Sequence, residues 1–248
     1  MEHVLEFVIS PQPDLKSCGP TCLHAIYRYF GDPITLEEVI RETEELEGGG
    51  TLAVLLGCHA LRRGYSATVY TYDLDLFDPT WFRHPSVDMA DKLRRQMEVK
   101  GGAKYRLASE AFVDFLERGG EVRMEDISST LLRKYLTNSV PILGGLSSTY
   151  LYNERREVTS SGEPDDVRGE PQGHFVVLCG YDSIRREVLI ADPLCPNPLA
   201  VQEHYSIPLG HVIASIMLGI VTYDANLLVI QPVHRRKGTV GAHADHHG

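Results

Sequence analysis

The sequence predicts an α+β fold in which a helical N-terminal half packs on an antiparallel sheet formed by the C-terminal half. The first half carries apolar residues at helical spacing between glycine-rich breaks. The second half carries short apolar runs that are rich in β-branched residues and bounded by turn formers. Helices that precede the strands, rather than alternate with them, favour α+β packing over repeated βαβ units.

The predicted helices lie mainly in the N-terminal half. Ser17 and Pro20 suit the start of a helix, and apolar residues recur at helical spacing from Leu23 to Phe30. The segment from Thr35 to Glu38 has the form of a capping box, so a second helix opens there. Helices are therefore predicted over residues 18–30, 35–46, 52–63, 87–100, 109–118 and 128–136.

The predicted strands lie mainly in the C-terminal half. Period-two alternation or short β-branched runs predict strands over residues 66–72, 140–146, 175–180, 187–191 and 227–231. The most apolar stretch, residues 212–221, is too short to span a bilayer. We interpret it as a buried helix that runs into a strand.

Length and local composition predict a single domain with one insertion. Residues 1–233 form the domain, with a helical insertion within about 73–138, and residues 234–248 form a disordered tail because their apolar content is too low to fold. The polar segment 153–173 leads directly into His174. It is either a mobile flap beside a site or an inert surface loop.

Charge and cysteine content limit the class of protein. A net charge of −10 argues against nonspecific nucleic-acid binding. The N-terminus is acidic where a signal peptide needs a basic flank, so we expect a cytoplasmic protein with no membrane partner. Five scattered cysteines, an odd number, are then more consistent with reduced thiols than with a disulfide framework.

Cys18 is the predicted nucleophile. At the first turn of a helix, free N–H groups and the positive end of the helix dipole lie near the sulfur and favour the thiolate. Such a nucleophile needs a general base. A lone cysteine on an amphipathic helix is more often a core residue, so the assignment depends on the rest of the site.

His174 and Asp192 are the predicted base and its orienting carboxylate. His174 begins an otherwise apolar strand, where a polar side chain needs a partner. A hairpin centred near Ser183 pairs residues whose numbers sum to 366, and this register puts Asp192 directly opposite His174, with Cβ atoms roughly 5 Å apart. Asp182, the rival carboxylate, lies at the turn, too far from His174 to orient it.

Gln12 is the predicted oxyanion-hole residue. Acyl transfer through a thiolate generates an oxyanion, which needs hydrogen-bond donors nearby. A glutamine shortly before the nucleophile supplies a side-chain amide beside the backbone N–H of Cys18.

These residues, in this order, resemble the papain-like cysteine peptidases of the bacteriocin-processing, double-glycine leader type and their stand-alone relatives. The resemblance covers roughly residues 8–32 and 140–195 and includes the segments Cys18-Gly19-Pro20 and Asp192-Pro193. It implies a papain-like α+β fold with Cys18 as nucleophile, His174 as base, Asp192 as orienter and Gln12 in the oxyanion hole.

The chain departs from that family in two ways. The stretch between cysteine and histidine is longer than compact members need, which we attribute to the insertion within 73–138. No transporter membrane domain follows in the sequence, so a bacteriocin leader is not carried over as the substrate.

Other cysteines and histidines have simpler interpretations. Cys22 lies one helical turn after Cys18 and is interpreted as a packed small side chain, and the two thiols lack the further ligands that a metal site needs. Cys58 and His59 are adjacent on a helix and point about 100° apart, so they make a poor catalytic pair. Trp81 is interpreted as a core anchor rather than as a cleft residue.

The sequence therefore predicts a thiol-dependent cysteine peptidase or amidase that forms an acyl-enzyme and needs no cofactor and no metal. Its expected partner is a peptide or another amide-containing substrate. An acyl or peptidyl transferase uses the same thiol chemistry and stays open as an alternative. A catalytically inactive binding module on the same scaffold stays open as well.

Overall fold

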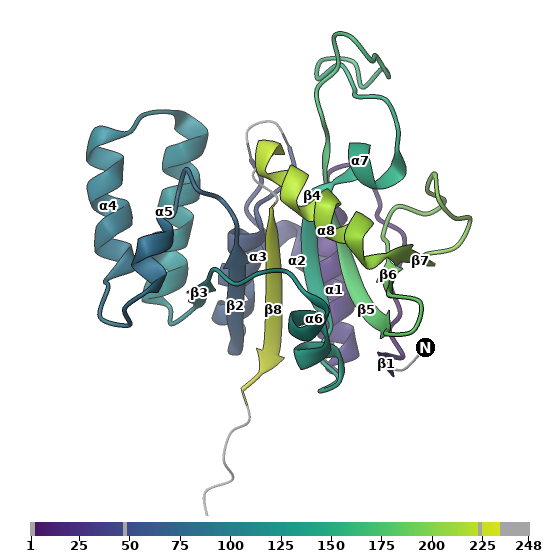
Figure 1. Ribbon diagram of the computed structural model, residues 1–248, viewed down its shortest axis with the longest axis horizontal. Helices are drawn as coiled ribbons and strands as arrows, with labels where there is room; N and C mark the ends of the chain where they lie inside the picture. The colour runs from purple at the N-terminus through teal and green to yellow at the C-terminus, as the bar shows by residue number, and fades with distance from the viewer. Residues whose placement is uncertain (1–2, 47–48, 223–224, 234–248) are drawn as a thin grey trace, which may run out of the picture.

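One mixed sheet runs through the structure and brings distant parts of the chain together (Figure 1). The computed structural model describes residues 3–46, 49–222 and 225–233. The tail predicted over residues 234–248 lies outside this described part.

Within the described residues the sheet has the strand order β3-β2-β8-β4-β5-β6-β7, and β1 pairs with β5. The β2–β3 pair is parallel and the other pairs are antiparallel. The strands are β1 His3–Val4, β2 Tyr65–Thr71, β3 Glu121–Arg123, β4 Ile142–Ser147, β5 Gly173–Asp182, β6 Glu187–Ala191, β7 His204–Pro208 and β8 Asn226–Pro232.

Helices cover both faces of the sheet. Figure 1 shows α8 crossing one face, while α1 and α3 lie on the other. The helices are α1 Cys18–Tyr29, α2 Leu36–Glu42, α3 Ala53–Arg62, α4 Met89–Val99, α5 Ala103–Glu117, α6 Ser129–Leu136, α7 Ser148–Tyr152 and α8 Leu209–Leu218, with 3₁₀ turns η1 Pro79–Phe82 and η2 Gly219–Thr222. In the described part of the chain, no helix has the combination of length and apolar character that a bilayer crossing requires.

The core lies between α1, α3 and the sheet. Leu23 and Ile26 of α1, Leu56 of α3 and Val177 of β5 are fully buried. Burying each such side chain contributes about 1.5–3 kcal/mol to folding. The same packing holds the first turn of α1 against β5, which is the contact that the candidate site needs.

Most predicted elements are confirmed, with shifts at their ends. Helix α1, helix α3 and strand β6 match their predicted ranges to within about one residue. Helix α2 ends at Glu42 rather than near residue 46, because Thr43 adopts an extended backbone and turns its hydroxyl back to the carbonyl of Val39. The strand predicted at the end of 212–221 is wrong, since α8 passes into η2 instead.

Residues 73–138 contain more than the helices that the pattern predicted. Helices α4 and α5 pack on each other at one end of the sheet, beside α3 (Figure 1). Helix α5 begins six residues earlier than predicted, 109 − 103 = 6. The short strand β3 was not predicted, and it joins the sheet through parallel pairing with β2.

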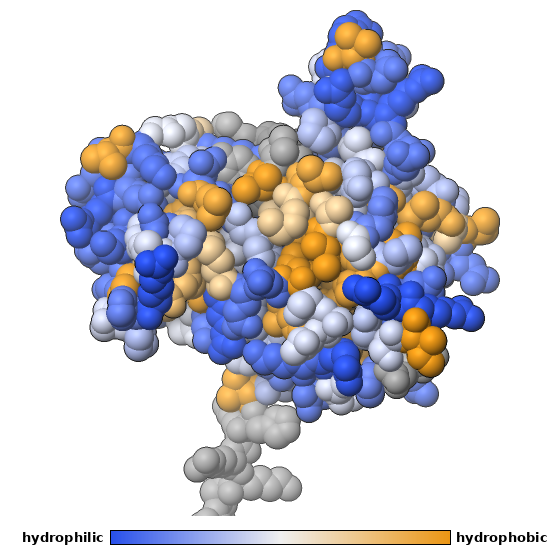
Figure 2. Space-filling view, viewed as in Figure 1, coloured by the Kyte–Doolittle hydropathy of each residue, from blue (hydrophilic) through white to orange (hydrophobic). Residues whose placement is uncertain are grey.

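The segment 153–173 projects from the body between α7 and β5 (Figure 1). Its base is ordered by main-chain bridges from Glu157 to Pro164 and to Glu170. Its projecting surface is mostly hydrophilic (Figure 2). The root of this loop, at Glu154, Arg155 and Glu157, forms one wall of a cavity beside His174.

Candidate active site

Cys18 is the first residue of α1 and is 9% exposed. Its neighbours explain why the helix begins against β5. A Cβ atom at Gly19 would lie 2.8 Å from Cγ2 of Thr51 and 3.1 Å from the ring of Phe175, so a glycine permits this close approach. The amide groups of the first turn have no acceptor within the helix, and they point toward the same end as the Cys18 side chain.

His174 lies at the start of β5, where it pairs with Leu146 of β4. The imidazole is buried, and its Nε2 lies 2.8 Å from Oδ1 of Asp192. Cys18 and His174 line the same cavity, and the Cys18 side chain is near enough to act on the pKa of the imidazole. Because Nε2 is engaged by the carboxylate, Nδ1 is the ring nitrogen that remains for the thiol.

Asp192 follows β6 and reaches His174 through a register that differs from the predicted one. Val177 pairs with Ala191, so the numbers of paired residues sum to 368 instead of the predicted 366. Nearer the turn, a bulge near Cys179 shifts the register again. The predicted direct pairing of His174 with Asp192 is therefore wrong. The error is two residues, so Asp192 stays on the same face of the sheet and meets His174 as a diagonal neighbour.

The electrostatics of this pair favour a charged imidazole beside a charged carboxylate. Burial lowers the pKa of His174, but its hydrogen bond to the Asp192 carboxylate, together with the interaction with Cys18 and the charges of both groups, outweighs burial and raises the pKa to about 10. Burial likewise raises the pKa of Asp192, yet the hydrogen bond and charge of His174 bring it below its ordinary value. A buried carboxylate and imidazolium therefore stabilise each other.

Gln12 lies close to the pair but donates elsewhere. Its backbone N–H donates to the carbonyl of Pro193, 2.8 Å away, and fixes this segment beside Asp192. Its side-chain Nε2 donates to the carbonyl of Asp14 at 2.8 Å. Its Oε1 is buried and has no hydrogen-bond partner among the described residues. The amide is thus held by the local turn.

Two cavities meet at His174. One of about 320 Å³ includes Cys18, and the other of about 190 Å³ includes Gln12 and Tyr152. The first is lined further by Leu46, Gly50, Thr51, Lys104 and Phe175, and the second by Ser148, Thr149, Glu154, Arg155, Gln172 and Leu194.

Two tyrosines belong to this site and were not predicted. The hydroxyls of Tyr152 and Tyr205 both donate to Oδ2 of Asp192. The sequence pattern predicts no helix or strand at either position, whereas Tyr152 ends α7 and Tyr205 lies in the edge strand β7. The available signal was indirect: a buried carboxylate requires donors for both of its oxygens.

Cys22 and Cys58 lie in the core. Cys22 is fully buried, donates to the carbonyl of Phe175, and has its pKa raised well above the ordinary value by burial. Burial raises the pKa of Cys58 to about 12. Within the described residues, no group of histidine, cysteine and acidic side chains is arranged to hold a metal ion.

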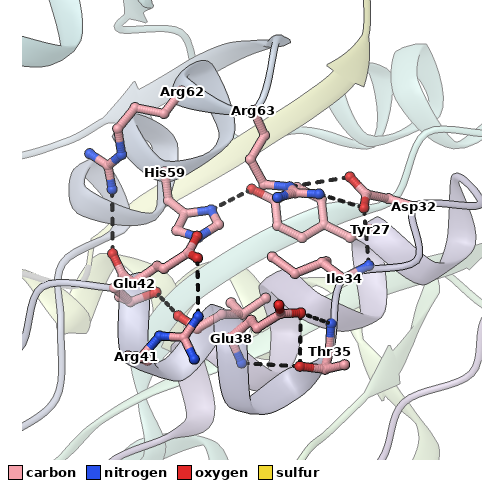
Figure 3. A network of polar contacts seen from close by, with 12 residues as sticks. Tyr27, Asp32, Ile34, Thr35, Glu38, Arg41, Glu42, His59, Arg62 and Arg63 are labelled. Carbon is pink, nitrogen blue, oxygen red and sulfur yellow. Dashed lines mark hydrogen bonds and ion pairs between the residues drawn. The ribbon is translucent and has the colours of Figure 1, made fainter.

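His59 belongs to a separate polar cluster in which His59 and Tyr27 are buried while Glu42 reaches the surface (Figure 3). Its Nδ1 lies 2.8 Å from the hydroxyl of Tyr27, and its Nε2 lies 3.3 Å from Oε2 of Glu42. Arg63 stacks over the Tyr27 ring and pairs with Asp32. None of these groups lines the cavities at His174, so this cluster is a structural connection between α1, α2 and α3.

The His59 cluster predicts a loss of stability in acid. Burial lowers the pKa of His59, so near and below pH 6.5 the unfolded chain binds a proton that the folded chain resists. Stability is therefore complete above this pH and falls as the pH drops below it. In urea unfolding between pH 7.5 and 5.5, we expect His59→Gln to lose less stability than the wild type. Exposed His84 supplies the control, since His84→Gln should keep the wild-type slope. Equal slopes for His59→Gln and wild type would contradict the prediction.

A family model described as Peptidase_C39 like family matches residues 4–211. A search of curated proteins finds no match to this chain.

Three solved structures are similar over most of the chain. Xylellain, a cysteine protease from Xylella fastidiosa, is 13% identical with a TM-score of 0.47, covering 94% of this chain and 87% of that one. The peptidase domain of Streptococcus ComA is 11% identical with a TM-score of 0.45, covering 92% and 100%. A double glycine motif protease from an AMS/PCAT transporter, solved with its leader peptide, is 15% identical with a TM-score of 0.44, covering 94% and 96%.

Proposed function

The chain belongs to the Peptidase_C39 like family, and from this premise we propose that it cleaves peptide bonds with Cys18 as nucleophile, His174 as general base and acid, and Asp192 as the carboxylate that orients His174. Membership makes the chain a cysteine peptidase-like hydrolase with a papain-like α+β fold. The residue roles and the peptide substrate are the proposal.

One observation carries the residue roles. Nε2 of His174 is bonded to the Asp192 carboxylate, and the Cys18 side chain lines the same cavity as His174 and acts on the pKa of its imidazole. This leaves Nδ1 for proton transfer with the sulfur, which is the arrangement that nucleophile, base and orienting acid require. The three side chains come from α1, β5 and the end of β6, and the packing of α1 on β5 supports the proposal.

The proposed reaction has two steps. The Cys18 thiolate adds to the carbonyl carbon of the substrate, and His174 gives its proton to the departing amine as the C–N bond breaks. A water molecule then loses a proton to His174 and adds to the thioester, which releases the acid product and the thiolate. The backbone N–H of Cys18 and the side chain of Gln12 are the proposed donors to the oxyanion. For this, Gln12 turns one amide hydrogen away from the local turn that it now serves.

A peptide mixture with mass spectrometric detection of new chain ends tests this function. We expect the wild-type protein to generate new carboxyl and amino termini, and brief treatment with iodoacetamide to remove this activity as Cys18 becomes alkylated. Alkylation of Cys18 without loss of cleavage would refute the proposed nucleophile. An added amine such as hydroxylamine separates hydrolysis from transfer, because a transferase would form the hydroxamate in place of the acid.

A further inference from the structure

We propose that Tyr152 and Tyr205 are positioning residues of the catalytic site: together they bind one oxygen of the Asp192 carboxylate and keep that carboxylate charged and aimed at His174. This inference rests on the proposed function of the Cys18 site. It assigns a role to two residues that contact neither the thiol nor, in the case of Tyr205, either cavity at His174.

The hydrogen bonds of Asp192 divide between its two oxygens. Oδ1 accepts from His174 Nε2 at 2.8 Å and from the backbone N–H of Leu194 at 2.9 Å. Oδ2 accepts from the hydroxyl of Tyr152 at 2.8 Å and from that of Tyr205 at 2.5 Å. Asp192 is completely buried, so these four donors replace the water that a carboxylate normally binds.

The two tyrosines approach from different parts of the fold. Tyr152 is the last residue of α7, a short helix that follows β4. Tyr205 lies in β7, at the edge of the sheet, where it pairs with Ile190 of β6. For both hydroxyls to reach one oxygen, α7 and β7 must be held on either side of Asp192. The backbone N–H of Asp192 donates to the carbonyl of Glu203, just before β7, and this bond holds β7 in place.

The chemistry of the buried charge gives this contact a function beyond packing. In the described part of the chain, the ion pair of Asp192 is with His174 and with no lysine or arginine. Besides His174, the titratable groups that interact electrostatically with the Asp192 carboxylate are Cys22, Cys195 and the two tyrosines. The charge thus depends on His174 and on hydroxyl donors, and hydrogen bonds to a charged group are stronger than those between neutral groups.

The tyrosines themselves stay protonated under all conditions of interest. Burial, followed by the nearby charge of Asp192, raises the pKa of Tyr152 and of Tyr205 far above the ordinary value. Each hydroxyl is therefore a permanent donor. With Oδ2 occupied by two donors, rotation of the carboxylate would break two hydrogen bonds, so Oδ1 stays directed at Nε2 of His174.

Conservative variants test the proposal. In Tyr205→Phe and Tyr152→Phe, Oδ2 loses one donor while the ring is retained. We expect the carboxyl group of Asp192 to titrate about one pH unit higher in each variant, and higher still in the double variant, because a hydrogen bond to a charged group is worth about that much. Tyr205→Phe is the cleaner variant, since Tyr152 also lines a cavity.

Two measurements read this effect. Carbon NMR of aspartate carboxyl groups, with the Asp192 signal assigned by its loss in Asp192→Asn, gives the titration directly. Alkylation of Cys18 by iodoacetamide, followed by peptide mass spectrometry, gives the low-pH limit of thiolate reactivity. We expect this limit to move to higher pH in the variants, because protonation of Asp192 removes the partner of the His174 imidazolium. Tyr150→Phe is the control: Tyr150 lies on the same helix, is 43% exposed and stacks on His211.

The proposal is overturned if Asp192 titrates at the same pH in the variants as in wild type, or if their alkylation profiles coincide with that of Tyr150→Phe. Thermal unfolding separates both results from simple loss of structure, since a merely structural tyrosine would lower the melting temperature without moving either pH profile. If Cys18 of the wild type reacts no faster than Cys195 at neutral pH, the proposed function fails instead, and the Asp192 titration alone then decides the role of the tyrosines.

Discussion

Replacing Cys18 with alanine is expected to lower kcat/KM for peptide cleavage by more than about 10³-fold. The side chain supplies the bond-forming sulfur, and the remaining site offers no second nucleophile: Cys22 lies one turn further along α1 but is fully buried and bonded to the carbonyl of Phe175. Loss of the nucleophile from a three-residue site typically removes most of the rate enhancement. The small enhancement that remains comes from substrate binding and the oxyanion hole.

Cys195 provides the matched control for that experiment. Cys195 is only partly buried and lies outside the core. Its Sγ donates to the carbonyl of Val201, and it follows Asp192 by 195 − 192 = 3 residues. Cys195→Ala should retain nearly full activity. The measurement is the initial rate of product formation at substrate concentrations well below KM, with protein concentration matched by absorbance. Activity retained in Cys18→Ala, or lost equally in Cys195→Ala, would be incompatible with the assigned nucleophile.

The parts of the site that could be predicted are those fixed by local sequence. Helix α1 begins at Cys18, and the signals that predict it are Pro20 in the first turn and apolar residues at helical spacing, which act within a few residues. The Ser17 hydroxyl donates to Asp14 and does not cap the helix. The hairpin of β5 and β6 could likewise be predicted from two apolar runs around a turn. The register of this hairpin could not be predicted, because the bulge between Leu178 and Gly180 has no clear sequence signal.

The predicted contact between His174 and Asp192 is present despite the different register, for a geometric reason. A shift of two residues returns each side chain to the same face of the sheet, whereas a shift of one would have moved Asp192 to the opposite face. The predicted partner was thus right although its position along the strand was wrong.

The missing parts of the site depend on contacts between distant segments. Tyr205 lies on an edge strand of five residues with mixed polarity, and Tyr152 ends a helix of five residues, so neither segment has a strong periodic pattern. Their contact with Asp192 follows only from the position of β7 and α7 around β6. The local turn that holds the Gln12 amide, through the carbonyl of Asp14, is also a detail that a spacing argument cannot supply.

Replacing Asp192 should have the largest effect on stability. In Asp192→Ala the buried imidazole of His174 loses its ion-pair partner, and the hydroxyls of Tyr152 and Tyr205 lose their acceptor. Removing one partner of a buried pair costs about 3–5 kcal/mol. We therefore expect urea unfolding of Asp192→Ala to show a loss of this size. A loss below about 1 kcal/mol would mean that water or a neighbouring group replaces the carboxylate.

Asp192→Asn separates the charge from the hydrogen bonds. The amide can still accept from His174 and contact the tyrosines, so the structure should be largely retained. Without the negative charge, the pKa of His174 should fall from about 10, because the hydrogen bond and charge of Asp192 are among the causes that raise it against burial. The reactive state needs a protonated His174 beside the thiolate, and this state is lost as the pH rises through that pKa. The high-pH limit of kcat/KM should therefore move down by more than one pH unit in Asp192→Asn.

The matched surface variant Asp166→Asn should leave the high-pH limit unchanged, since Asp166 is exposed on the 153–173 loop. A high-pH limit unchanged by Asp192→Asn would show that the carboxylate only shapes the site and does not set the charge of His174.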